Sequence, residues 1–256
     1  MGELFSNFLA QMVMTIGMII LFGFLIATFN KMFYRNFGGN ALTVCYVTGA
    51  IGTPVHELAH ALMCVIFRHR IDEIKLFQIS SDDGTLGYVA HSWNPKNLYQ
   101  SAGNFFIGVA PILVISLVLY GLGCWLVPEM MGGVVSIGSQ IDGIGGIFTG
   151  IIDILGYMVS FAGEGKWWLF FFISIFLALH MTLSGADIKG AGSGILIVLG
   201  FFLVLNIIFY LLGGLTAFSS AILSFGGILV AFLTIGLAST IFAWLISVIL
   251  KWVFKF

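Results

Sequence analysis

The chain has 256 residues, of which 60% are hydrophobic and only 8% are charged, and its formal net charge is -1. Its mean hydropathy of +1.11 lies far above the range of water-soluble domains. This composition excludes a soluble globular protein and argues against nucleic acid as a partner, because the few charges lie in short connecting segments. We therefore expect an all-α polytopic membrane protein in contact with membrane lipids.

A membrane-spanning helix needs about 20 mainly apolar residues. By this measure the sequence predicts about six spans in a single domain, residues 1–256. Lys and Arg are more numerous on one face of this arrangement, which places both termini in the cytoplasm. We expect the membrane to be a bacterial plasma membrane. The predicted spans are residues 8–29, 41–67, 101–127, 167–187, 193–212 and 217–250.

The polar stretch between the second and third predicted spans has the pattern of a β-hairpin. The runs IDEIKLFQIS and TLGYVAHSW are rich in Ile, Leu, Phe, Tyr and Val, and they flank SDDG, whose Asp-Gly pair favours a tight turn. We expect a small cytoplasmic hairpin over residues 71–93, at the membrane surface. His69 is expected to be solvated in a basic cluster there, and His91 to lie in a surface loop.

A glycine-rich stretch follows the third predicted span, over residues 128–165. Its acids Asp142, Asp153 and Glu164 recur every 11 residues, and on a helix this interval returns each acid to nearly the same face. With apolar residues opposite, the pattern is typical of a helix that lies in the membrane interface. We expect one interfacial helix here, either with a plain polar stripe or as a gate over a site in the membrane.

The second predicted span carries the most informative motif, HELAH. Histidines at i and i+4 lie on one helix face, so His56 and His60 can bind one cation, and Glu57 can reach a water molecule beside it. Ionisable groups inside a span are costly and mark functional sites. The sequence thus predicts a Zn2+ site about 15 Å below the cytoplasmic surface, at 1.5 Å per residue. Thr53 and Pro54 have the pattern of a helix N-cap and first residue.

Catalytic zinc keeps three protein ligands and one open position, so a third ligand is needed. The fourth predicted span offers His180, Ser184 and Asp187, which share one face of a continuous helix at i, i+4 and i+7. Either His180 or Asp187 could coordinate the ion. The spacing of these residues alone leaves both assignments open.

These motifs resemble the site-2 protease family of intramembrane zinc metallopeptidases. The resemblance runs in order through a core of residues 41–190. It comprises HELAH in the second span, FRHRIDEIKLF leading into the hairpin, SAGNFFIGVAPILVIS in the third span, and an aspartate late in the fourth. Two positions depart from the family pattern. Ala110-Pro111 stands where the family has Gly-Pro, and the fourth span reads Ala186-Asp187-Ile188, without the family's prolines and Leu-Asp-Gly.

The resemblance implies a zinc-dependent endopeptidase that cleaves transmembrane or membrane-associated peptides. It implies that Asp187 joins His56 and His60 as the third ligand of one Zn2+ per chain, with Glu57 as the catalytic base. His180 falls one residue from the family's asparagine, which implies that it polarises or orients the substrate. The reverse assignment of His180 and Asp187 is the main alternative. Two other classes stay open: a noncatalytic metal-binding relative that binds membrane partners, and a metal or ion transporter.

Overall fold

The structure, a computed structural model, describes residues 2–79 and 84–254. Within them the chain is almost entirely helical with one two-stranded sheet, which confirms an all-α polytopic membrane protein. Five helical stretches of the described chain are long and apolar enough to cross a membrane, one fewer than predicted. These stretches are Gly2–Arg35, Gly38–Ile66, Leu98–Leu126, Gly185–Leu211 and Leu215–Phe254.

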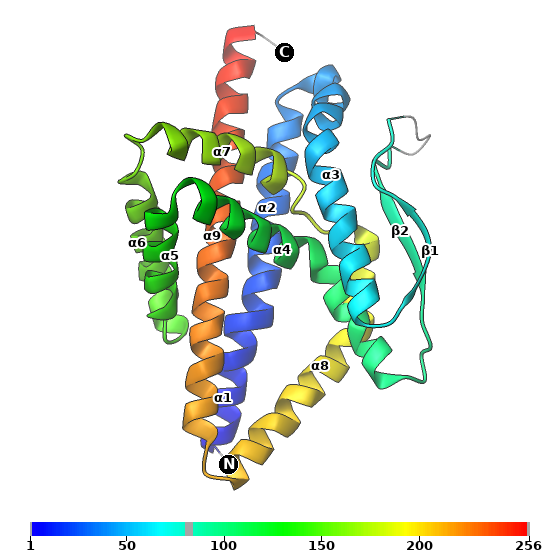
Figure 1. Ribbon diagram of the computed structural model, residues 1–256, viewed down its shortest axis with the longest axis vertical. Coiled ribbons are helices and arrows are strands. Elements are labelled where there is room, and N and C mark those ends of the chain that lie inside the picture. Colours follow the sequence, from blue (N-terminus) through cyan, green and yellow to red (C-terminus); the bar gives the residue numbers. More distant parts are fainter. Residues whose placement is uncertain (1, 80–83, 255–256) are drawn as a thin grey trace.

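The first and last helical stretches run along the long axis of the molecule (Figure 1). The first consists of α1 (Gly2–Met12), a π-helical turn (Val13–Gly17) and α2 (Met18–Arg35), and it packs along α9 (Leu215–Phe254). The chain begins at one end of the long axis, and α9 ends at the other (Figure 1).

Three helices enclose the region that carries the HELAH motif. α3 (Ala41–Ile66), which follows a 3-10 turn (Gly38–Asn40), and α8 (Gly185–Leu211) both pack against α4 (Leu98–Leu126). α4 crosses the middle of the molecule obliquely (Figure 1). At the crossing with α8, small residues let the two backbones touch. A Cβ on Gly194 would lie 2.6 Å from the backbone nitrogen of Phe105, and a Cβ on Gly108 would collide with the Asp187 carbonyl.

The fourth predicted span, residues 167–187, is not one helix. α7 (Gly165–Ala178) has only 14 residues, and the chain turns through residues 179–184 before α8 begins. The prediction that His180, Ser184 and Asp187 share a helix face was therefore wrong. Apolar residues fill the segments on both sides of the turn, so hydropathy alone cannot locate the break.

The glycine-rich segment is also divided. α5 (Pro128–Ser139) and α6 (Ile147–Val159) are joined through a 3-10 turn (Ile144–Gly146), and both helices pack against each other and against α9. Asp142 lies in the connection, Asp153 on α6 and Glu164 just before α7, all of them exposed. The expectation that one helix carries the three acids on one face was wrong, because the backbone leaves the helical conformation between α5 and α6.

The predicted hairpin is present as β1 (Arg70–Lys75) paired antiparallel with β2 (Tyr88–Ser92). The SDDG turn falls mostly on residues 80–83, which lie outside the described residues. The hairpin runs back alongside α3 (Figure 1). A Cβ on Gly49, near the middle of α3, would lie 2.8 Å from the side chain of Leu86. The residues before β2 therefore lie against the same part of α3 that carries the motif.

Candidate metal centre

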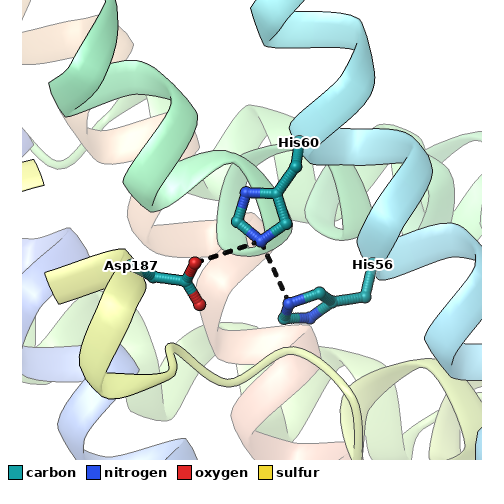
Figure 2. Close-up of side chains that lie close together, drawn as sticks. All are labelled: His56, His60 and Asp187. Atoms are coloured by element: carbon teal, nitrogen blue, oxygen red, sulfur yellow. Dashed lines mark hydrogen bonds and ion pairs between the residues drawn. The ribbon is translucent and has the colours of Figure 1, made fainter. Parts of the chain in front are cut away.

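α3 places the two motif histidines in contact. The helix continues without a break through Pro54, so Thr53 is not an N-cap as predicted. His56 and His60 lie one turn apart and direct their rings toward the same point, with their Nε2 atoms 3.1 Å apart (Figure 2). His60 is buried and His56 half-buried, so the two imidazoles meet inside the protein.

The third member of the cluster, Asp187, comes from the first turn of α8. Its Oδ1 lies 3.3 Å from His60 Nε2 (Figure 2). Its Oδ2 accepts a hydrogen bond from the Ser184 backbone N–H at 2.7 Å, while the Ser184 hydroxyl accepts one from the Asp187 N–H at 3.1 Å. This reciprocal capping box fixes the start of α8 and the orientation of the carboxylate together. One carboxylate oxygen caps the helix and the other faces the histidines.

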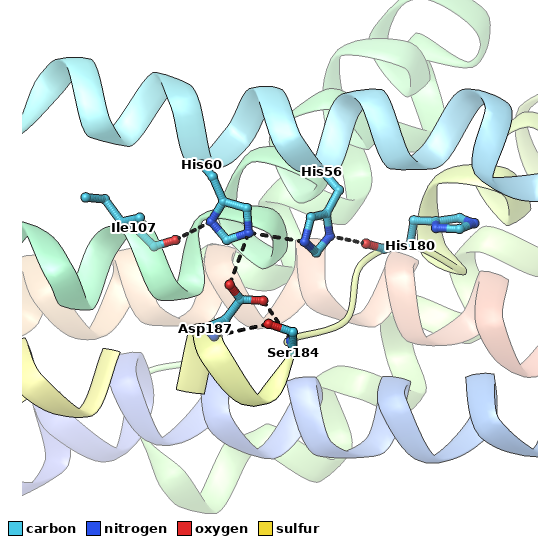
Figure 3. Close-up of polar contacts among 6 residues, drawn as sticks. All are labelled: His56, His60, Ile107, His180, Ser184 and Asp187. Atoms are coloured by element: carbon cyan, nitrogen blue, oxygen red, sulfur yellow. Dashed lines mark hydrogen bonds and ion pairs between the residues drawn. The ribbon is translucent and has the colours of Figure 1, made fainter. Parts of the chain in front are cut away.

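Backbone carbonyls determine which nitrogen of each motif histidine carries the proton. The Nδ1 of His56 lies 2.8 Å from the carbonyl oxygen of His180, and the Nδ1 of His60 lies 2.8 Å from that of Ile107 (Figure 3). A carbonyl oxygen can only accept, so each Nδ1 donates a proton and each neutral ring turns an Nε2 lone pair toward the other. Two lone pairs 3.1 Å apart repel each other unless a cation lies between them.

The donor set fits a divalent ion such as zinc. One ligand atom from each of His56, His60 and Asp187 lies within 4.8 Å of the others. Two nitrogens on a tetrahedral zinc would be separated by about 3.3 Å, given bonds of about 2.0–2.1 Å. The separations of 3.1 Å and 3.3 Å are close to that value. Two histidines and one carboxylate also leave a fourth position open, as in catalytic sites.

Glu57 lies beside this cluster, as the motif predicts. It is 6% exposed and lines the same cavity as the three ligand candidates. The chain just before β2 passes directly over it, because Gly87 has no side chain. A Cβ on Gly87 would lie 2.8 Å from Glu57 Cγ and 2.8 Å from the Lys75 carbonyl oxygen. Glu57 is therefore held between α3 and the hairpin.

The cluster opens into a cavity of about 420 Å³. One wall is the HELAH face of α3, and two others come from α4 and the start of α8. The hairpin forms the remaining wall with β2 and the residues just before β2. Asn104 on α4 lines this cavity, is 4% exposed, and has no hydrogen bond from its side chain to any described residue. Its amide is an unused polar group in the cavity beside the ligand cluster.

His180 takes part through its backbone and not through its ring. The imidazole points away from the cluster (Figure 3), with Nε2 3.1 Å from the Thr48 hydroxyl and Nδ1 3.3 Å from the Thr53 hydroxyl. Gly52 provides the space, since a Cβ there would lie 2.7 Å from His180 Cγ. Of the two third-ligand candidates, the structure groups Asp187 with the motif histidines and leaves the His180 side chain outside the cavity lining.

Sequence reasoning missed several parts of this site. The carbonyls of Ile107 and His180 carry no side-chain signature, and their role follows only from tertiary structure. The Ser184–Asp187 capping box could have been found, because serine followed three residues later by an acid is a known helix-start signal. Reading that signal would have placed the helix start at residue 185 and separated His180 from Asp187.

Comparisons of the chain with protein-family models, with curated proteins and with solved structures gave no match.

Proposed function

We propose that this protein is a zinc-dependent endopeptidase that cleaves transmembrane or membrane-associated peptides. One observation carries the proposal: ligand atoms of His56, His60 and Asp187 converge, and Glu57 lines the same cavity. A carboxylate beside two histidines of a helix and a third ligand is the arrangement with which metallopeptidases activate water. The resemblance of HELAH and the later aspartate to site-2 proteases supports the same reaction class.

The ligand cluster, Glu57, Asn104 and the His180 carbonyl have separate roles in this proposal. Glu57 accepts a proton from the attacking water and later returns it to the leaving amine. Zinc, when held by the three ligands, would polarise the scissile carbonyl and make water more acidic. Asn104 donates an amide N–H to the oxygen of the reacting carbonyl, where negative charge develops. The carbonyl of His180 orients the His56 ring.

The substrate segment must be extended at the cleaved bond, because helical hydrogen bonds shield a peptide group. β2 offers a place for such a segment. Its only strand partner among the described residues is β1, while Tyr88, Val89 and His91 of β2 line the cavity. An extended peptide could therefore add to the sheet beside Glu57, and its backbone hydrogen bonds would offset part of the cost of unwinding.

The proposal is tested by zinc analysis of the purified protein and by mass spectrometry of a synthetic single-span peptide incubated with it in liposomes. We expect one zinc per chain and cleavage by the parent protein. Glu57→Gln should retain zinc and lose cleavage, because the amide cannot accept the proton. Glu164→Gln is the matched control, since Glu164 is exposed outside the cavity.

The same preparation separates the alternatives. Zinc binding without cleavage of any peptide would favour a noncatalytic metal-binding protein. Zinc uptake into liposomes that depends on the three ligands would favour a transporter. Cleavage by Glu57→Gln at the parent rate would contradict the assignment of Glu57 as the base.

A further inference from the structure

His69 and His91 lie against each other, outside the ligand cluster. Their Nδ1 atoms are 3.1 Å apart. His69 is 6% exposed, and its ring stacks on Trp93 with centroids 5.8 Å apart and 14° between the planes. His91, on β2, is half-buried and lines the cavity that contains Glu57. Neither histidine has the solvated position expected from the sequence, because the hairpin folds back against α3 and α4.

The backbone conformation next to His69 directs its ring toward His91 and Trp93. Arg68 follows the C-cap of α3 and has a φ of 57°, in the left-handed region where glycine is usual. That turn lets the His69 N–H bond to the Cys64 carbonyl oxygen at 2.8 Å. On α4, Gly103 leaves room for Phe67 and for the imidazole, since a Cβ there would lie 2.7 Å from Phe67 Cγ and 3.1 Å from His69 Nε2. The turn at Arg68 thus places the His69 ring, and Gly103 lets it pack against α4.

The hydrogen bonds of the pair fix its protons. His69 Nε2 lies 2.7 Å from the carbonyl oxygen of Gln100, which can only accept, so His69 carries its proton on Nε2. The Nδ1 of a neutral His69 is then a lone pair. His91 Nδ1, 3.1 Å away, must donate to it. The remaining nitrogen of His91, Nε2, is left as an acceptor, and the described residues give it no hydrogen-bond partner.

We propose that His69 holds His91 in its Nδ1-protonated tautomer, so that His91 Nε2 accepts a hydrogen bond from a backbone N–H of the substrate in the cavity. The inference rests on the proposed peptidase function. An extended peptide beside β2 presents N–H groups to this strand. Within the cavity, His56, His60 and Asp187 turn their free lone pairs toward the ion, and Glu57 serves the attacking water. His91 Nε2 then gives the peptide a side-chain acceptor on β2 itself, and His69 is a positioning residue.

The tautomer is tested by ¹⁵N NMR of histidine-labelled protein near pH 8, with the His91 signals assigned from His91→Phe. We expect a proton on Nδ1 of His91 and on Nε2 of His69. An isolated imidazole prefers the Nε2 proton, so the expected state of His91 is one that only a specific partner produces.

Peptide binding is tested in the Glu57→Gln background, which prevents turnover, with the synthetic single-span peptide as the probe. His91→Phe should weaken binding about threefold to tenfold, the range for one hydrogen bond. His69→Phe should weaken it as well, because it releases the His91 tautomer. His91→Gln, which keeps an acceptor, should restore part of the affinity. Ser92→Ala is the control, since Ser92 is exposed and does not line the cavity. Zinc content should be unchanged in all four variants.

Three results would overturn the inference: a proton on Nε2 of His91, unchanged peptide binding in His91→Phe, or a second zinc per chain that is lost in His91→Phe. Failure of the proposed function gives a different pattern. Peptide binding that depends on His91, without cleavage by the parent protein, would contradict the peptidase assignment and support this inference. Cleavage by the parent protein with unchanged binding in His91→Phe would contradict this inference alone.

Discussion

Asp187 accepts a hydrogen bond from the Ser184 backbone N–H through Oδ2 and lies 3.3 Å from His60 Nε2 through Oδ1. One carboxylate thus joins the start of α8 to the motif on α3. The Ser184 hydroxyl completes the link by accepting from the Asp187 N–H at 3.1 Å. Because one oxygen caps the helix while the other faces the histidines, a change in the helix cap should alter the affinity of the site for a metal ion.

Ser184→Ala should therefore weaken zinc binding without abolishing it. Loss of the cap should destabilise the start of α8 by about 1 kcal/mol, and the loss of a group that supports a metal ligand lowers affinity by about tenfold to 100-fold. Competition with a zinc chelator measures the affinity. Ser193→Ala is the control, because Ser193 is exposed further along α8. Equal zinc affinity in the two variants would contradict the role of the cap.

His180→Ala distinguishes a positioning residue from a ligand. The ring contacts the Thr48 and Thr53 hydroxyls, and only its carbonyl reaches His56. We expect the variant to retain one zinc per chain with reduced affinity, since the carbonyl remains but the segment that holds it loosens. Asp187→Ala should lose zinc. Metal analysis after dialysis against a weak chelator compares the two. Loss of zinc from His180→Ala with retention in Asp187→Ala would show that the third ligand is misassigned.

Asn104→Asp removes an N–H donor from the cavity while keeping the size of the side chain. The side chain is 4% exposed and has no hydrogen bond to a described residue. If its amide stabilises the reacting oxygen, kcat should fall about 100-fold to 1,000-fold, the usual effect of losing one such donor. KM and zinc content should change little. A fall in zinc content equal to the fall in kcat would instead indicate a structural role.

His91 should make the fold sensitive to acid. Burial, then His69 and His60, lowers the pKa of His91, while Asp72 partly opposes the shift. A histidine with a lowered folded-state pKa is protonated more readily in the unfolded chain, whose pKa is about 6.5. Stability from this group is therefore present above that pH and is lost as the pH falls from there toward the folded-state pKa.

Thermal unfolding in detergent at pH 7.5 and pH 5.5 measures this dependence. The Tm of the parent protein should be lower at pH 5.5 than at pH 7.5, and this decrease should be smaller in His91→Phe. Other titrating groups contribute to both proteins, so the difference between them isolates the contribution of His91. An identical fall in both proteins would contradict the prediction.

The parts of the site that the sequence predicts correctly are local. His56, Glu57 and His60 lie within one helix, so their shared neighbourhood follows from helix geometry alone. The pairing of β1 with β2 follows from the strand pattern, although residues 76–87 form a longer connection than the tight turn expected from Asp-Gly. Hydropathy identifies the long apolar helices, although it also predicts a span over residues 167–187 where the chain turns.

The parts that the sequence does not predict depend on contacts between distant segments. Asp187 reaches His60 because Gly108 and Gly194 let α8 approach α4. The hydropathy pattern of the sequence does not predict how closely two helices approach each other. His69 and His91 are 22 residues apart and meet because β1 pairs with β2 in a register that sets Ile71 opposite His91. A polar residue in a short segment between spans is usually solvated. His69 and His91 are shielded from solvent because they pack against each other and against neighbouring segments of the fold.

The central claim is that two helices hold one divalent ion through His56, His60 and Asp187 inside the membrane-embedded part of the protein. X-ray absorption spectroscopy of the zinc in the purified protein tests it most directly. The account predicts two imidazole nitrogens at about 2.0–2.1 Å and carboxylate oxygen at about 2.0–2.2 Å, with the oxygen contribution changed in Asp187→Ala. A protein that binds no zinc, or a spectrum with three imidazoles that loses one in His180→Ala, would contradict it.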